Sequence, residues 1–287
     1  MNTVLVTPAR WLAAFVAVAA LLAGFLVPQA ATAAAERGSG ALAYAPQTEA
    51  LFKSDGQALY RSDSGGREWA KVPLPPLAKA ARVTAMAVSG VGQGALYVAG
   101  RGLGLLKSTH AGKNWVPIGQ GLPSDDVVAL AAHSSAADTI YAVVASKGIY
   151  RTEDGGKRWR MVDKGPQAAL RSFIHSGMEG SMQSGWLFAA TDKGVYRAMD
   201  CFCGFRLAGN LPGPVSAVTY DPKQPKELYA AVGKDVFITA NGGEDWQKAA
   251  SPGGDVGALA YSPSGGLYAL LADGRVVHSK DKGKQWE

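Results

Sequence analysis

An eight-residue segment that ends in an aromatic residue recurs along this chain, and it limits the fold more than any other feature. Its copies end at Trp69, Trp115, Trp159, Phe205, Trp246 and Trp286. The ends are 46, 44, 46, 41 and 40 residues apart. A fixed period of roughly 20–50 residues indicates a repeat architecture, in which each unit packs against its neighbours. The chain therefore contains six copies of one structural unit.

The third copy shows the internal order of the unit most clearly. It contains four short runs rich in β-branched and aromatic residues, at 127–132, 139–144, 148–152 and 158–162. Such runs, separated by Gly, Ser, Asp and Pro, are typical of antiparallel strands joined by tight turns. The 36 glycines and 15 prolines among 287 residues fit the many turns that this requires. The pattern predicts an all-β fold over residues 41–287, a six-bladed β-propeller of four-stranded antiparallel blades.

The recurring segment has the chemistry of a hairpin turn between the third and fourth strands. Its Asp or Asn can accept hydrogen bonds from the following backbone, and the Gly two residues later supplies a positive φ. Its Trp or Phe can pack against a neighbouring blade, where a large aromatic face contributes more than its area alone. We therefore assign structural rather than catalytic roles to Ser62, Gly66, Trp69, Ser108, Gly112, Trp115, Thr152, Asp154, Gly156, Trp159, Asp200, Phe205, Thr239, Asn241, Gly243, Trp246, Ser279, Asp281, Gly283 and Trp286.

These segments resemble the Asp-box, or BNR repeat, of sialidase-like and sortilin-like propellers, written Ser-x-Asp-x-Gly-x-x-Trp. The match is complete in the sixth copy, from Ser279 to Trp286, whereas Ser64 and His110 replace the Asp in the first two copies. Those two turns must be held by other means. The chain is most similar to exported, non-catalytic BNR propellers such as the photosystem II stability and assembly factor family. The resemblance implies a propeller that binds another protein during assembly or stabilisation of a complex.

Residues 1–35 have the layout of an export signal. Arg10 is followed by an uncharged, apolar run at 11–27 and then by small residues, including Ala33-Ala34-Ala35, which form a small-x-small cleavage motif. The 17 residues of this run also reach the lower limit for a helix that crosses a bilayer. The segment is therefore either a cleaved signal peptide or an uncleaved membrane anchor. In both cases we expect a periplasmic or extracellular propeller.

Few features of the sequence point to an enzyme. Sialidases of this fold need three arginines, a Tyr nucleophile with a Glu partner and an Asp acid, and their Arg-Ile-Pro segment is missing here because Arg37 is followed by Gly38. Arg61, Arg151 and Arg197 each precede an Asp-box, which makes them a feature of the repeat. No carboxylate pair of the glycosidase kind stands out. We assign no catalytic residue, while a glycan-binding or sialidase-like glycosidase stays an alternative that predicts an Arg and carboxylate cluster in the central funnel.

The charge of the chain is mildly basic. Lys and Arg number 29 against 23 Asp and Glu, a formal net charge of +6. This excess suits an acidic partner or a membrane surface. No block of basic residues interleaved with aromatics occurs, so we do not expect a nucleic-acid partner.

The fourth copy departs from the others in a chemically specific way. Both cysteines of the chain, Cys201 and Cys203, lie in its Asp-box. They can form a disulfide in an oxidising compartment or stay free thiols. They can also bind Cu(I) together with other soft donors that the hairpin connections bring to the same end of the blade. The candidate copper ligands are His175, Met178, Met182, Met199, Cys201 and Cys203.

We interpret the chain as an exported, non-catalytic scaffold that binds a protein of a membrane or periplasmic complex. No cofactor is required for this role. A copper or thiol-redox accessory protein that uses the fourth blade is the second alternative to it, after the glycosidase.

Overall fold

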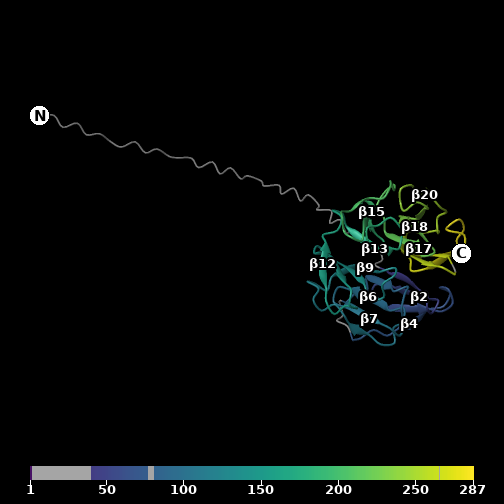
Figure 1. The fold of residues 1–287 in the computed structure, drawn as a ribbon, viewed down its shortest axis with the longest axis horizontal. Helices are drawn as coiled ribbons and strands as arrows, with labels where there is room; N and C mark the ends of the chain where they lie inside the picture. The colour runs from purple at the N-terminus through teal and green to yellow at the C-terminus, as the bar shows by residue number, and fades with distance from the viewer. Residues whose placement is uncertain (2–39, 77–80, 265) are drawn as a thin grey trace. The chain divides into compact units, whose positions relative to one another are not determined.

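The computed structural model describes Met1 and residues 40–76, 81–264 and 266–287 (Figure 1). The predicted export segment lies outside the described residues apart from Met1. No helix within the described ranges is long and apolar enough to cross a membrane.

Six antiparallel sheets follow one another along the chain, and the strands of each sheet pair in chain order. The first three sheets consist of β1 (Leu42–Ala45), β2 (Ala50–Ser54), β3 (Leu59–Ser62), β4 (Ala70–Val72); β5 (Ala85–Val88), β6 (Leu96–Gly100), β7 (Gly104–Ser108), β8 (Val116–Pro117); and β9 (Val127–Ala132), β10 (Ile140–Val144), β11 (Gly148–Thr152), β12 (Arg160–Asp163). The last three consist of β13 (Leu170–Ser176), β14 (Trp186–Thr191), β15 (Gly194–Met199), β16 (Arg206–Leu207); β17 (Ala217–Asp221), β18 (Gln224–Val232), β19 (Asp235–Thr239), β20 (Gln247–Lys248); and β21 (Val256–Ser262), β22 (Gly266–Leu271), β23 (Val276–Ser279).

The first strand of each sheet contacts the first strand of the next, in the order β1, β5, β9, β13, β17 and β21. The ring closes because β21 also contacts β1. Each sheet is therefore a blade, numbered one to six along the chain, and the all-β six-bladed propeller expected from the repeat is confirmed.

The core lies between neighbouring blades and is carried mainly by the second strands. All five residues of β10 are buried, and their side chains alternate between two interfaces. Ile140 packs with Tyr97 of blade two, whereas Tyr141 packs with Phe173 of blade four. Burial of one such side chain stabilises the fold by about 1.5–3 kcal/mol. Packing on both faces explains why these strands are continuously apolar in sequence.

The Asp-box of blade three shows how the repeated turn is held. Thr152 Oγ1 accepts a hydrogen bond from the Gly156 N–H at 2.9 Å and donates one to Asp154 Oδ1 at 2.8 Å. The same Asp154 oxygen accepts from the Arg158 N–H at 3.0 Å, so the fourth strand starts at Arg160 rather than at 158. The φ of Gly156 is 96°, a left-handed conformation that favours glycine.

In four of the boxes the tryptophan joins its blade to the one before it. Trp159 Nε1 donates to the carbonyl of Ile118, the residue that follows the outer strand of blade two, at 2.7 Å. The same contact with the preceding blade is made by Trp115, Trp246 and Trp286, which donate to the carbonyls of Pro73, Ala208 and Ala250. The turn thereby fixes the spacing between blades as well as the hairpin.

The two boxes without Asp are held differently from each other. In blade one, Ser64 Oγ accepts from the Glu68 N–H at 2.9 Å, as the Asp oxygen does in blade three. In blade two, His110 is exposed, and the turn is held by Ser108 Oγ, which accepts from the Gly112 N–H at 2.9 Å. The turn of blade two therefore forms without an Asp, with the bond from the Gly112 N–H to Ser108 Oγ retained.

Within the described part of blade six there are three strands rather than four. Beyond β23, His278 and Glu287 exchange a pair of backbone hydrogen bonds of 2.8 and 2.9 Å, the beginning of a fourth ladder. Trp69 of blade one, which follows blade six in the ring, donates instead to Gly66 of its own box at 2.9 Å.

Candidate functional site

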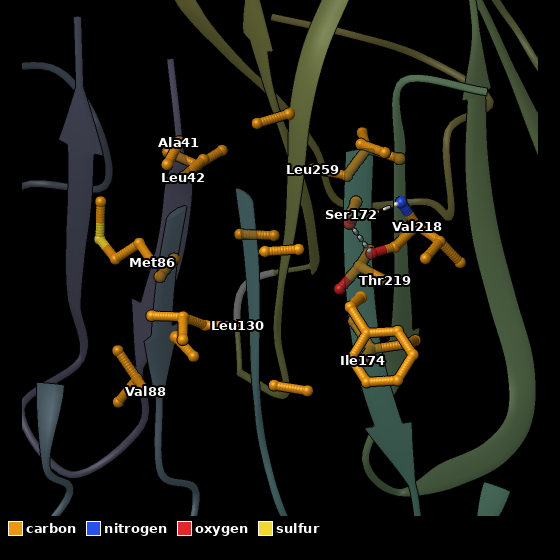
Figure 2. A pocket seen from close by; sticks show the side chains of 18 of the residues that line it. Ala41, Leu42, Met86, Val88, Leu130, Ser172, Ile174, Val218, Thr219 and Leu259 are labelled. Carbon is orange, nitrogen blue, oxygen red and sulfur yellow. Dashed lines mark hydrogen bonds between the residues drawn. The ribbon is translucent and has the colours of Figure 1, made fainter. Parts of the chain in front are cut away.

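A central channel of about 360 Å³ lies between the first strands of the six blades (Figure 2). The strands run in the same direction, since Met86 lies above Val88 and Ser172 lies above Ile174 in this view (Figure 2). Its walls include the aliphatic side chains of Leu42, Met86, Leu130, Ile174, Val218 and Leu259. The volume falls at the lower end of the roughly 300–1,000 Å³ that is usual for ligand pockets.

The hydroxyl groups near the starts of the strands hold neighbouring blades together. Ser172 Oγ donates to the Val218 carbonyl at 3.5 Å, and Ser216 Oγ donates to the Val256 carbonyl at 2.6 Å (Figure 2 shows the first). Thr84 Oγ1 donates to the Val127 carbonyl at 3.1 Å. These polar groups are therefore engaged in closing the ring.

The channel wall carries little charge. Among its described lining residues Arg171 is the single Arg or Lys, and no Asp or Glu occurs. Arg61 and Arg197 instead lie over the rings of Phe52 and Trp186 in their own blades. The Arg and carboxylate cluster that the glycosidase alternative predicts does not occur among the described residues of this funnel.

Aromatic and imidazole side chains surround the mouth at the ends of the strands. Tyr44, Tyr220 and Tyr261 line it together with His133 and His175. Burial raises the pKa of Tyr220 to about 12. Burial, followed by a hydrogen bond to the Asp221 carboxylate, also raises the pKa of Tyr261 to about 12. Both phenols are therefore neutral donors at physiological pH.

A polar cluster is buried beside this mouth, between blades three and four. It consists of His133, which follows β9, His175 in β13, Ser184 before β14 and Asp200 after β15. The two imidazole rings stack with their centroids 3.9 Å apart, and His175 Nε2 lies 3.5 Å from Asp200 Oδ2. Ser184 Oγ donates to that carboxylate oxygen and lies 2.8 Å from His133 Nε2. His175 and Asp200 are each 1% exposed.

Backbone donors set the proton positions of both imidazoles. His133 Nδ1 accepts from the N–H groups of Ser135 and Ala136 at 3.1 Å, and His175 Nδ1 accepts from the Ser134 N–H at 3.1 Å. An Nδ1 that accepts a hydrogen bond carries no proton, so each neutral ring holds its proton on Nε2.

That proton arrangement is unsuitable for a metal or for serine activation. Ligand atoms of His133, His175 and Asp200 lie within 4.8 Å of one another, as in a metal centre. A metal bound at Nε2 would require a proton on Nδ1, directed at backbone N–H donors. Likewise, Ser184 Oγ cannot give its proton to a protonated Nε2, so these residues do not form a Ser-His-Asp triad. The geometry identifies none of them as a metal ligand.

The structure divides the six soft donors among different environments. Cys201 and Cys203 form a disulfide, which removes their thiolates as ligands. Met178 is buried in the core between blades four and five with Met199 packed against it, while Met182 is 76% exposed. His175 belongs to the imidazole cluster described above. Copper binding by this set stays a prediction.

The disulfide accompanies a rebuilt Asp-box in blade four. Ala198 stands where the other boxes have Ser or Thr, so the hydroxyl that holds the turn is missing. Phe202 takes the left-handed position with a φ of 58° in place of Gly. Asp200 is released from the box and points inward to Ser184 and His175, whereas Asp154 in blade three stays at the surface. The box carboxylate has therefore become part of an inter-blade cluster.

The sequence assigned His175 to a candidate copper site and Asp200 to an Asp-box, and it gave no role to His133 or Ser184. The signal that was available is the position of His133, which directly follows the first strand of blade three. Its partners come from blade four, and only the packing of the two blades brings them together.

Comparison with known proteins adds three findings. The model of the family described as photosynthesis system II assembly factor YCF48 matches residues 41–287. A photosystem II assembly lipoprotein Ycf48 from Synechococcus sp. (strain CC9902) is 28% identical over 206 residues, which cover 67% of this chain and 57% of that protein. The chain thus spans little more than half the length of this curated relative.

Solved structures share the fold at low identity. A structure of YCF48 bound to D1 peptide superimposes with a TM-score of 0.55 at 18% identity, over 86% of this chain and 80% of that one. The GH74 xyloglucanase of Xanthomonas campestris gives 0.59 at 18%, over 86% and 46%. A nidogen/laminin complex gives 0.66 at 14%, over 83% and 90%. Such likenesses establish the propeller and leave the task open.

Proposed function

This chain belongs to the family of photosynthesis system II assembly factor YCF48, and we propose on that premise that it is a non-catalytic assembly or stability factor that binds a protein of a membrane complex. The observation that carries the proposal is the extent of the family match, which takes in all six blades. The relatives named for photosystem II assembly support a binding role, and one of them was solved with a peptide.

The central channel suits a short apolar peptide segment. Its wall consists mainly of aliphatic side chains, and its innermost strands leave one edge each without a strand partner in the same sheet. Unpaired backbone groups on such an edge can hydrogen-bond an extended peptide. A volume of about 360 Å³ accommodates a few side chains rather than a folded domain.

The chemistry of the channel favours binding over glycoside hydrolysis. Glycosidases position two carboxyl groups across the scissile bond, about 5–10 Å apart. The described channel wall holds none. The GH74 structures therefore share the fold of this protein but do not support a glycosidase mechanism for it.

An exported, membrane-associated location fits this role. The curated relative is a lipoprotein, and residues 1–35 have the layout of an export signal or anchor. We place the propeller outside the cytoplasm, on the face of the membrane where an assembling complex exposes its termini and loops.

Capture from native membranes tests the proposal. The full chain is cross-linked in membranes of its host, and the proteins bound to it are identified. The wild type is compared with Met86→Trp, which fills the channel, and with the control Met161→Trp on the exposed outer strand of blade three. We expect a subunit of an integral membrane complex to be captured by the wild type and Met161→Trp and lost with Met86→Trp. Equal capture by all three forms would remove the channel from the proposal, and recovery of free monomer alone would remove the assembly role.

A further inference from the structure

The cluster between blades three and four holds the blades together through groups that change with protonation. Two hydrogen bonds cross the interface, from the Ser134 N–H to His175 Nδ1 at 3.1 Å and from His133 Nε2 to Ser184 Oγ at 2.8 Å. The stacked imidazole rings also belong to opposite blades. None of these contacts is made by a group with a fixed charge.

Each neutral imidazole can take a second proton only at Nδ1, and in both rings this nitrogen faces backbone N–H donors. A proton added to His175 Nδ1 would meet the Ser134 N–H, which is held in place by the backbone. The Ser134 hydroxyl, 3.1 Å from the same nitrogen, can accept from the charged ring but cannot remove that repulsion. A proton added to His133 Nδ1 would meet two N–H groups of the turn that follows it. Protonation therefore breaks one bond that crosses the interface, from Ser134 to His175, and two that border it, whereas His133 Nε2 keeps its bond to Ser184.

The groups that face the pair do not compensate for this cost. Arg151 adds a positive charge, and Asp200 and Glu153 add negative ones, while Tyr141 stacks on His175 as a neutral ring. Each imidazole also repels the other once charged, since their centroids are 3.9 Å apart. Burial, and next the neighbouring His133, lower the pKa of His175 to about 4, and burial lowers the pKa of His133.

Asp200 and His175 keep unused hydrogen-bonding capacity inside the cluster. Among the described residues, Asp200 Oδ1 and His175 Nε2 have no hydrogen-bond partner although both side chains are buried. A buried polar atom without a partner costs about 1–3 kcal/mol. The polar groups are thus less completely satisfied at this interface than at the Asp-boxes.

We propose that His133 and His175 form a proton-sensitive lock between blades three and four, closed while both rings are neutral and progressively weakened as the pH falls below neutral. Because both rings line the mouth of the central channel, opening widens that mouth. The lock is a property of the fold and stands whether or not the channel binds a peptide.

The sign and size of the effect follow from proton linkage. A histidine whose pKa falls on folding stabilises the protein above its unfolded pKa of 6.5, and this contribution is lost as the pH falls toward the folded value of about 4. For His175 alone, the unfolding equilibrium constant rises about 20-fold between pH ~7 and pH ~5. His133 increases this factor in the same direction.

Thermal unfolding of the full chain between pH ~7.5 and ~4.5 tests the lock. The comparison is with the double variant His133→Asn/His175→Asn, in which an Asn oxygen takes the place of Nδ1 and does not titrate, and with His110→Asn at an exposed box. We expect the midpoint of the wild type and His110→Asn to fall in this range and that of the double variant to fall less. Parallel profiles for all three would overturn the proposal.

A measurement on the wild type alone covers the case in which the double variant does not fold. Hydrogen exchange of the Ser134, Ser135 and Ala136 amides is followed against pH, corrected for the intrinsic exchange rate. We expect their protection to fall at least tenfold between pH ~7 and ~5 while the amides of β18 and β22 stay protected. Protection that is constant, or that is lost uniformly over the ring, would contradict a local lock.

Discussion

The contact between the Asp-box of blade three and blade two gives the sharpest quantitative prediction. A Cβ added to Gly156 would lie 2.6 Å from Ile118 Cβ, closer than real side-chain carbons approach. Ile118 cannot withdraw, because its N–H donates to Leu105 O at 2.9 Å and its carbonyl accepts from Trp159 Nε1 at 2.7 Å. Gly156→Ala therefore combines left-handed backbone strain with overpacking at a blade interface.

Gly121 provides a matched control for the strain alone. Its φ is 95°, against 96° for Gly156, and no atom lies within 4 Å of an added Cβ. Left-handed strain costs about 1–2 kcal/mol, of which about 0.4–1 is offset by the stiffer unfolded chain. We expect Gly121→Ala to cost about 0.5–1 kcal/mol. Overpacking adds about 1–3 kcal/mol to Gly156→Ala.

Thermal unfolding monitored by circular dichroism separates the two variants. For a domain of this size, 1 kcal/mol corresponds to about 2–4 °C in Tm. The midpoint of Gly156→Ala should lie about 2–12 °C below that of Gly121→Ala. In an Ile118→Gly background, which removes the obstructing Cβ, the penalty of Gly156→Ala should shrink toward that of Gly121→Ala. Equal midpoints for the two single variants would refute the role of the box as an inter-blade spacer.

Three further predictions concern the boxes and the fourth blade. Thr152→Val leaves the Gly156 N–H without its partner and removes one of the hydrogen bonds to Asp154, and it should cost about 1–3 kcal/mol. Thr48→Val on an exposed loop should cost less than about 0.5 kcal/mol, and both variants are measured by urea unfolding. Cys201→Ala/Cys203→Ala opens a closed loop of only three residues and should cost about 1–2 kcal/mol, with no further loss on adding reductant, while the wild type loses the same amount with reductant. Elemental analysis of the wild type and the cysteine variant tests the copper prediction: a stoichiometric copper content that disappears in the variant would support it, and equal metal content in both would remove it.

The repeat made the architecture predictable because the same local sequence pattern, and hence the same strands and turns, occurs six times. Alternating apolar runs, turn residues and a tryptophan at fixed spacing recur in each unit, so the strands of blade three lie within two residues of their expected positions. The substitution of Ser64 for Asp did not matter, since its hydroxyl accepts the same N–H bond. A turn depends on residues that are adjacent in sequence, and such dependence can be read from one chain.

The cluster at blades three and four could not be read in that way. His133 and His175 are 42 residues apart, and no motif links them to each other or to Ser184. Asp200 was assigned to its box by its position in the repeat, but it bonds to Ser184 instead, in the one box where Ala198 replaces the Ser or Thr hydroxyl. Only the tertiary structure shows that the Asp200 carboxylate lies beside His133 of the neighbouring blade.

The sequence by itself therefore determined the number of blades, the turn chemistry and the absence of a recognisable catalytic motif. The tertiary structure decided which side chains face the channel, that the cysteines pair with each other, and which imidazole nitrogens carry protons. The reason is physical. Strands and turns are set by contacts between near neighbours in the chain, whereas burial and the donors that surround a ring are set by residues that ring closure brings together from different blades.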